Sequence, residues 1–436
     1  MENSVQYITK VLEFLNENVR YALLRNYEQL PYCNSSRDID IIIEKGELKR
    51  CKAQIKNILL SDGWKLFSYL DNGRLTTFVC AKICGNSIEM VQWDFFVNTS
   101  IHGVELLSAK EMIDSRESNG TLYHVSKDYE FLDKYTYNRA VGAKYPEKYI
   151  ALRNEIKDSE IVKDRLNLLF GLDDYEKIDK CLGKRLFLRA FWSNFLKNPI
   201  KTIVNIIISM LIYFCQFLSS SIAPKIAFTG ADGAGKTTII ELLRSKLSPV
   251  YGKVAIYYHF RPLLIPNLGE VAHSVKLKKS VDREFEKPHR AKKKGVVNSF
   301  FRLCYYTIDY IFGYLVKIKP HCKITKLIIF DRYYNDIIVD SRRCSIYLNK
   351  KFLYWWGIVF IPKMDYNFLI TADTDIILKR KSELDREGVE RINENMRFLS
   401  TKKGFYMIDN SSTAEAAVID IFKIILEGQH QRLLTK

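Results

Sequence analysis

The stretch Gly230-Ala-Asp-Gly-Ala-Gly-Lys-Thr-Thr238 decides the fold of the second half of this 436-residue chain. It fits the pattern GxxxxGK[ST], with an apolar run, KIAFT, before it and a helix-forming run, TTIIELLRSKL, at its end. Glycines in such a loop let backbone N–H groups point at phosphate oxygens, and the N-terminus of the following helix adds positive charge. The sequence therefore predicts a P-loop that binds a nucleoside triphosphate.

The loop and a strand expected near it supply the residue types that phosphoryl transfer needs. Lys236 is expected to reach the β- and γ-phosphates of ATP, and Thr237 is expected to hold Mg²⁺. A buried-strand run, residues 327–330, is followed by Asp331, which would be the second Mg²⁺-binding group. The expected cofactor-binding residues are Gly230, Gly233, Gly235, Lys236, Thr237 and Thr238.

Residues 225–430 alternate between apolar runs of strand length and longer helical patterns. The runs KIAFT, KVAIYYHF, KLIIF, DYNFLIT and GFYMID are typical of strands, with helical patterns between or after them. Such alternation predicts an α/β fold in which helices flank a parallel sheet. We expect a P-loop kinase domain over residues 224–436.

The loop GADGAGKTT, with Asp232 inside it, resembles that of thymidylate kinases, and so does the tripeptide Asp331-Arg-Tyr333. The resemblance implies that Asp232 contacts the acceptor and that Arg332 helps to hold the transferring phosphates. An Arg-Pro pair beginning at Arg261 ends the second strand, as the family's arginine for the acceptor phosphate does. The resemblance thus implies a kinase that uses ATP and Mg²⁺, with Arg261 and Tyr333 in contact with the substrate.

The segment Leu378–Arg391 resembles the basic lid of these kinases. Its candidate phosphate contacts are Arg380, Lys381 and Arg386, because cations there would offset the charge of the transferring group. A single arginine in such a segment also fits a solvated helix face. The catalytic residues expected in this domain are Asp232, Lys236, Asp331, Arg332, Arg380 and Arg386.

Two departures from thymidylate kinases change the expected acceptor. Their Arg-Pro precedes a glycine-rich turn, whereas here LLIPNLGEV and a basic insertion at residues 275–295 follow. The motifs DRYYND and VDSRRC resemble a set of thymidylate kinase-like proteins associated with bacterial surface-polysaccharide loci. In that set, a nucleotidyltransferase-like unit, a basic apolar stretch and the kinase are fused. This resemblance implies a nucleotide, phosphosugar or lipid-linked glycan acceptor. The alternatives are a conventional dTMP kinase and a non-catalytic nucleotide-binding regulator.

Residues 1–105 are typical of a small α/β unit, and three of their carboxylates lie in strands. Asp38 and Asp40 open an apolar strand and share one face of it, and Asp94 lies in a later strand. Such a set would suit two Mg²⁺ ions, as nucleotidyl transfer requires. The pattern resembles the minimal nucleotidyltransferase fold, although residues 24–27 lack the glycine turn of that family. A solvated pair at a strand edge is the other interpretation of Asp38 and Asp40.

Residues 106–198 are typical of a helical connector, and an apolar helix is expected over residues 199–223. No charged residue occurs from Thr202 to Ala223, which is long enough to cross a membrane. The preceding run, Arg185–Lys201, is basic and amphipathic, which favours a helix lying on a membrane surface. A span would place one of two nucleotide-using domains outside the cytosol. A helix buried against the kinase is the second interpretation, and a true span is the third.

The charge balance favours anionic partners. Lys and Arg number 67 against 50 Asp and Glu, which gives a formal net charge of +17. No DNA- or RNA-binding motif is recognisable, so the expected partners are ATP, an anionic small-molecule or lipid-linked acceptor, and a membrane surface. Nine widely spaced cysteines and an N-terminus without an apolar signal segment predict a cytoplasmic protein. Together with the apolar segment and its basic flank, this predicts a location at the inner face of the membrane.

Overall fold

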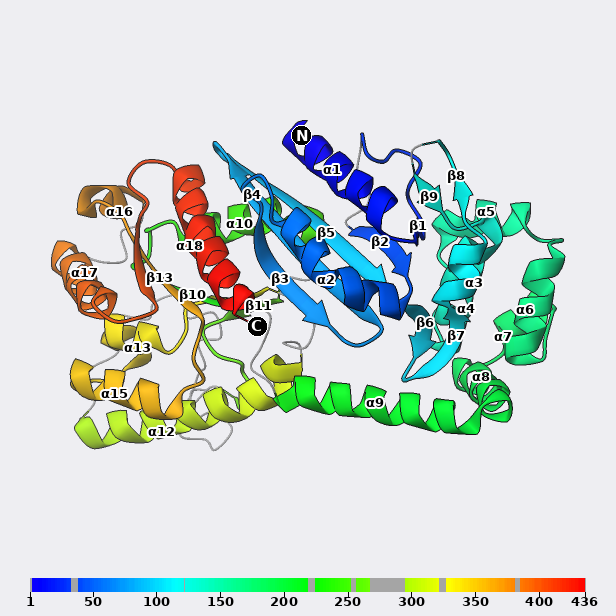
Figure 1. Cartoon of the computed structure of the whole chain (residues 1–436). Coiled ribbons are helices and arrows are strands. Elements are labelled where there is room, and N and C mark those ends of the chain that lie inside the picture. Colours follow the sequence, from blue (N-terminus) through cyan, green and yellow to red (C-terminus); the bar gives the residue numbers. More distant parts are fainter. Residues whose placement is uncertain are drawn as a thin grey trace. The chain divides into compact units, whose positions relative to one another are not determined.

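The computed structural model describes residues 2–32, 38–120, 122–218, 224–251, 256–266, 295–320, 327–380 and 385–435. The chain divides into two compact units (Figure 1). The first, the N-terminal unit, comprises residues 1–82 and 89–220, and the second, the kinase unit, comprises residues 83–88 and 221–436.

The kinase unit contains the predicted parallel sheet. In the described residues the sheet has five strands in the order β11-β12-β10-β13-β14, and all of its pairings are parallel. Each strand lies within a run that the sequence predicts as a strand, apart from one residue at the end of β12, so the α/β expectation is confirmed. The strands are β10 (Lys225–Thr229), β11 (Ile256–His259), β12 (Ile328–Asp331), β13 (Tyr366–Thr371) and β14 (Phe405–Asp409).

The order of the strands creates the place for a ligand. Residues 226–228 of β10 and 328–330 of β12 are at most 1% exposed, as expected for a parallel sheet covered on both faces. Strand β10 lies between β12 and β13, so the chain changes direction across the sheet there, and ligands bind at the carboxyl ends of strands at such a point. The helices of this unit are α10 (Lys236–Tyr251), α12 (Val296–Gly313) with a π-helical extension (Tyr314–Ile318), α13 (Asn335–Val339), α14 (Ser341–Cys344), α15 (Lys350–Phe360), α16 (Thr374–Arg380), α17 (Arg386–Ser400) and α18 (Ala414–Leu434).

The N-terminal unit is built on a mixed sheet. Its strands have the order β3-β4-β5-β2-β1-β9-β8, in which β2 runs parallel to β5 and antiparallel to β1. The sequence patterns predict a helix over residues 7–18 and strands over residues 21–24, 38–44 and 86–97. These correspond to α1 (Glu2–Asn18), β1 (Tyr21–Leu23), β2 (Asp38–Ile43) and β5 (Ser87–Phe96). The elements that the sequence patterns did not identify are α2 (Lys45–Leu59), β3 (Lys65–Asp71), β4 (Leu75–Cys84), β8 (Glu117–Ser118) and β9 (Tyr123–His124).

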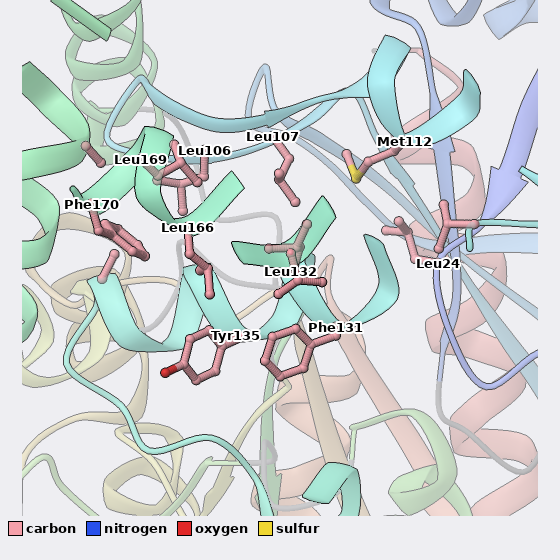
Figure 2. Packing of buried hydrophobic residues seen from close by; sticks show 14 of the residues in the cluster. Leu24, Leu106, Leu107, Met112, Phe131, Leu132, Tyr135, Leu166, Leu169 and Phe170 are labelled. Carbon is pink, nitrogen blue, oxygen red and sulfur yellow. The ribbon is translucent and has the colours of Figure 1, made fainter. Parts of the chain in front are cut away.

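One hydrophobic cluster joins the strands of this unit to its helices. Figure 2 shows Leu106 and Leu107 gathered with Phe131, Leu132 and Leu166. The predicted boundary between residues 105 and 106 therefore falls inside a strand of this cluster. The elements concerned are β6 (Asn98–Ile101), β7 (Val104–Ser108), α3 (Ala109–Asp114), α4 (Lys127–Ala140), a 3-10 turn (Glu147–Tyr149), α5 (Ile150–Glu155), α6 (Glu160–Phe170), α7 (Tyr175–Lys180) and α8 (Gly183–Lys197).

The apolar segment forms helix α9 (Pro199–Leu218). It begins where a helix is expected to begin: Asn198 accepts a hydrogen bond from the Lys201 backbone N–H at 3.0 Å, and Pro199 takes the first helical position. Within the described residues, α9 has the length and apolarity to cross a membrane, with a mean hydropathy of 1.5 over residues 199–216. Only 6% of that stretch is buried, and residues 219–223 of the predicted helix lie outside the described residues.

Candidate active site

The predicted P-loop connects β10 to α10, so the strand–loop–helix context of the motif is confirmed. Gly233 and Gly235 have φ values of +90° and +87°, in the left-handed region that favours glycine. A Cβ at Gly235 would lie 2.2 Å from the Asn410 side-chain nitrogen, and one at Gly230 would lie 2.3 Å from the Ile370 carbonyl oxygen. The loop geometry therefore requires these glycines.

A cavity of about 370 Å³ lies at the loop. Residues from the ends of β11 and β12 and from α10, α14 and α16 line this cavity, although these elements are far apart in the sequence. All of its lining residues except His259 and Arg343 are among the predicted site residues. The lining residues are Asp232, Gly233, Gly235, Lys236, Thr237, Thr238, His259, Asp331, Arg332, Arg343 and Arg380.

Lys236 is buried and turned onto its own loop. Its Nζ donates hydrogen bonds to the carbonyl oxygens of Gly230 at 2.9 Å and Ala231 at 2.7 Å. Burial lowers the pKa of Lys236 to about 7, and the nearby Arg332 guanidinium adds to this effect. An anionic phosphate beside Lys236 would restore its charge, which makes this side chain a suitable phosphate ligand.

Asp331 lies at the end of β12 and is 7% exposed. The Tyr257 hydroxyl donates to its Oδ2 at 3.0 Å, whereas its Oδ1 is buried and accepts no hydrogen bond from the described residues. A buried carboxylate oxygen without a donor suits a hard cation, and Thr237 offers a hydroxyl oxygen in the same cavity. The residues present therefore fit Mg²⁺, as the sequence predicts.

Asp232 is held by two arginines. It forms a close ion pair with Arg332 and a second one with Arg343, whose Nη2 lies 3.2 Å from Asp232 Oδ2. Arg332 also donates to both carboxylate oxygens of the buried Asp336, at 3.0 and 2.9 Å. Its φ of +69° is unfavourable for a side chain with a Cβ, and such strain persists where the surroundings hold it. These ion pairs fix Asp232 inside the cavity.

His259 and Arg343 were not predicted as site residues. His259 reaches the cavity because it pairs in register with Asp331 across the parallel strands β11 and β12. Partial desolvation lowers the pKa of His259. The sequence signal for His259 is its place at the end of a strand that lies beside the strand of Asp331. Arg343 lies in the motif VDSRRC, and no residue spacing in this motif identifies Arg343 as a site residue.

A curated relative, the probable thymidylate kinase of Pyrobaculum aerophilum, is 24% identical over 210 residues, which are 46% of this chain and 95% of the relative. About half of the chain is homologous to thymidylate kinase. The homology supports a nucleotide-kinase type of phosphotransferase that uses ATP and Mg²⁺. The solved thymidylate kinase structure from Ehrlichia chaffeensis is 19% identical, covers 47% of this chain and 98% of its own, and has a TM-score of 0.34. No family model matches the chain.

Arg261, predicted to contact the acceptor, has another environment in this kinase unit. It is 1% exposed, and its Nη1 lies 3.0 Å from Oδ2 of the fully buried Asp309. Asp309 Oδ1 also accepts hydrogen bonds from the backbone N–H groups of Leu264 and Ile265. The Arg261 guanidinium lies 4.5 Å from the centre of the Tyr306 ring. Arg261 does not line the described part of the cavity.

This ion pair predicts a large loss of stability when it is broken. Replacing Asp309 with alanine leaves the Arg261 charge buried without its carboxylate, and we expect the unfolding free energy to fall by about 3–5 kcal/mol. Urea denaturation measures the change. The double variant Arg261→Met, Asp309→Leu is the control, because it removes both charges and should recover most of the loss. An unchanged midpoint for Asp309→Ala would contradict the burial described above.

Two other predicted residues also lie outside the lining of the cavity. The Tyr333 hydroxyl donates to the Pro362 carbonyl oxygen at 2.7 Å, and Tyr333 lines a different cavity of about 350 Å³ with residues of α13, α15, β13 and β14. Arg386 begins α17 and forms an exposed ion pair with Asp375 of α16. Lys381 and most of the basic insertion, residues 275–294, lie outside the described residues. Of the predicted lid contacts, the described structure therefore places Arg380 in the cavity.

The three carboxylates of the N-terminal unit do come together. Asp40 and Asp94 face each other in the register of β2 and β5, and one oxygen each of Asp38, Asp40 and Asp94 lies within 4.8 Å of the others. Burial raises the pKa of Asp40 to about 7 and that of Asp94 to about 6, and neighbouring carboxylates contribute to both shifts. Asp40 Oδ1 is buried and accepts no hydrogen bond from the described residues.

Side chains around this cluster hold it in place. Thr77 and Gln92 donate to Asp94 at 2.5 and 3.0 Å. Arg25 forms ion pairs with Asp40 and with Asp133, both at 2.7 Å. Arg25 therefore supplies positive charge beside these carboxylates.

Proposed function

We propose that the kinase unit transfers a phosphoryl group from ATP to an anionic acceptor, a nucleotide, phosphosugar or lipid-linked glycan, in surface-polysaccharide synthesis. The observation that carries this proposal is the convergence of Lys236, Thr237, Asp331 and Arg332 in one cavity beside a glycine-lined loop. Bound ATP and Mg²⁺ would supply the transferable phosphoryl group and much of the charge neutralisation.

The residues of the cavity would then have distinct roles. Lys236 and the loop N–H groups bind phosphate oxygens, and Thr237 and Asp331 hold the metal ion. Arg332, Arg343 and Arg380 offset negative charge on the transferring group. Asp232 faces the acceptor, and its ion pairs with Arg332 and Arg343 fix its position. Such positioning accounts for most of the catalysis of phosphoryl transfer.

An acceptor other than dTMP is supported by the environment of Arg261. The resemblance to thymidylate kinases assigns this arginine to the acceptor phosphate, but here Asp309 neutralises it and both side chains are buried. A panel assay of the purified chain with labelled ATP tests the proposal, with dTMP, other nucleoside monophosphates, phosphosugars and lipid-linked glycans as acceptors. We expect turnover of an acceptor other than dTMP. Robust dTMP turnover would establish the conventional dTMP kinase instead.

We also propose that the chain works in the cytoplasm at the inner face of the membrane. Support comes from the exposed apolar helix α9 and from its surroundings, because residues 181–224 contain five Lys or Arg and no Asp or Glu. The helix lies along the N-terminal unit: a Cβ at Gly103 would meet the backbone of Asn205, and the Gln216 side chain donates to the Asp71 carbonyl at 3.2 Å. With these two attachment points, α9 suits a bilayer surface better than a span.

A second candidate function is a divalent-metal site at Asp38, Asp40 and Asp94, of the kind that nucleotidyltransferases use. The specific support is the close approach of the three carboxylates, which includes a buried oxygen without a donor. One or two Mg²⁺ ions held there would orient a triphosphate.

Metal binding by this cluster gives a direct prediction. Titrated with Mn²⁺ in the absence of nucleotide, the chain should bind the ion, and Asp94→Asn should weaken that binding by about tenfold or more because one anionic ligand is lost. The exposed Asp62→Asn is the matched control and should leave binding unchanged. Electron paramagnetic resonance of free Mn²⁺ measures both. Equal affinities in the wild type and Asp94→Asn would remove this candidate function.

A further inference from the structure

A small polar cavity lies in the N-terminal unit where helix α8 meets the apolar helix α9. Its volume is about 150 Å³, comparable with the size of a phosphate group and a few neighbouring atoms. It belongs to neither site described above. Its lining residues are Gly103, Glu105, Arg165, Leu169, Ser193, Asn194, Lys197, Asn198, Lys201, Thr202 and Asn205.

Three cations line this cavity. Arg165 donates to Glu111 at 2.7 Å, and Lys201 lies 3.6 Å from Glu105. Lys197 forms no ion pair with a carboxylate in the described part of the chain. These three cations and two carboxylates leave one positive charge in excess. Partial desolvation lowers the pKa of the exposed Lys197, the nearby Arg165 adds to this effect, and Glu111 offsets part of it.

One donor in the cavity wall is also left over. The Arg165 Nε–H is buried and has no acceptor among the described residues. Buried donors normally have a partner, so this one is available to an acceptor atom of a ligand or a water. Other polar groups around the cavity are already used: Asn194 donates to the carbonyl oxygens of Glu105 and Ala190, and Ser193 donates to that of Leu168. Lys197 and the Arg165 Nε–H therefore remain to bind a ligand.

The cavity shares a helix with the exposed apolar surface. Lys201, Thr202 and Asn205 of α9 line it, while the neighbouring positions of the same helix point to solvent. These neighbours form what we call the α9 apolar face: Ile200, Ile203, Val204, Ile207, Ile208, Met210, Leu211, Tyr213 and Phe214 are between 43% and 77% exposed. Leu188, Trp192 and Leu196 of α8 add to it and are between 52% and 79% exposed.

We propose that this cavity binds the phosphate headgroup of an anionic phospholipid while the α9 apolar face lies in the bilayer surface. The inference rests on the proposed membrane location and names the lipid group that the chain recognises there. The N-terminus of α9 beside the cavity adds its positive partial charge, and the guanidinium of Arg165 matches phosphate oxygens. A phospholipid offers both an anionic group for the cavity and an apolar environment for the α9 apolar face, because its headgroup and acyl chains are covalently connected.

The test compares two charge-matched variants of the full-length chain by co-sedimentation with vesicles. The cavity variant is Lys197→Gln, Lys201→Gln, and the control is Lys184→Gln, Arg185→Gln, which removes two exposed charges of the same segment that do not line the cavity. Vesicles are phosphatidylcholine alone or phosphatidylcholine with phosphatidylglycerol. Both variants should lose general electrostatic attraction, and the cavity variant should lose about tenfold more affinity for the anionic vesicles than the control.

The possible outcomes distinguish the headgroup cavity from the proposed membrane location and the proposed kinase function. Equal losses in the two variants would overturn the headgroup cavity and leave the membrane location standing. If the wild type sediments with no vesicle, the headgroup cavity and the membrane location are both wrong. The proposed kinase activity, which a separate assay tests, would be unaffected. A third experiment measures the binding of inorganic phosphate to the wild type and to the cavity variant. If the cavity variant loses phosphate binding but keeps wild-type vesicle binding, the ligand is free phosphate and the lipid proposal is wrong. Circular dichroism checks that α8 and α9 remain helical.

Discussion

Lys236→Ala is expected to lower the rate of phosphoryl transfer by at least about 10²–10³-fold, because it removes the cation that the loop holds for the phosphates. In the free protein Lys236 contacts the carbonyl oxygens of Gly230 and Ala231, so the variant loses no ion pair and should fold. Turnover of labelled ATP measures the rate, and calorimetry measures ATP affinity.

The exposed Lys351→Ala provides the control, since it removes the same charge from the same unit at a distance from the loop in sequence. Its turnover should match that of the wild type. If Lys236→Ala bound ATP with Mg²⁺ as tightly as the wild type and turned over at the same rate, the loop would not be the nucleotide site. The proposed function of the kinase unit would then be wrong.

Asp331→Asn should have an effect of similar size, at least about 10²-fold on turnover, through the metal ion rather than the phosphates. Asparagine keeps the size of the side chain, and its amide oxygen can still accept the hydrogen bond from the Tyr257 hydroxyl. It removes the negative charge that the buried, donor-free Oδ1 offers to Mg²⁺. We therefore expect the Mg²⁺ dependence of turnover to shift to higher concentrations, measured by titrating Mg²⁺ at fixed ATP.

The same variant separates an enzyme from a non-catalytic regulator. Asp420→Asn, an exposed change on α18, is the control for the loss of one carboxylate. If the chain acts as a kinase, its cellular function should be lost with Asp331→Asn and retained with Asp420→Asn. Full cellular function with Asp331→Asn, together with no turnover of any acceptor by the wild type, would favour the regulator.

The nucleotide-binding part of the site could be predicted from the sequence because its parts are local. The backbone conformations at Gly233 and Gly235 and the start of α10 are properties of about ten consecutive residues, so the motif carries them directly. Asp331 could be predicted because a buried strand has a continuous apolar pattern and ends at a recognisable place. Asp38, Asp40 and Asp94 followed from strand periodicity, and the parallel register of β2 and β5 brings them together.

The proposed acceptor side of the site depends on contacts between residues far apart in the chain. Arg261 is neutralised by Asp309, 48 residues later, and Arg343 reaches Asp232 across 111 residues. No periodic pattern links such pairs, since side-chain spacing rules extend over one or two turns of helix or a few strand positions. Similarly, the apolar composition of residues 202–218 permits a span, a surface helix or a buried helix. Contacts with Gly103 and Asp71 place one face of α9 on the N-terminal unit and leave the other exposed, because packing acts on the folded chain.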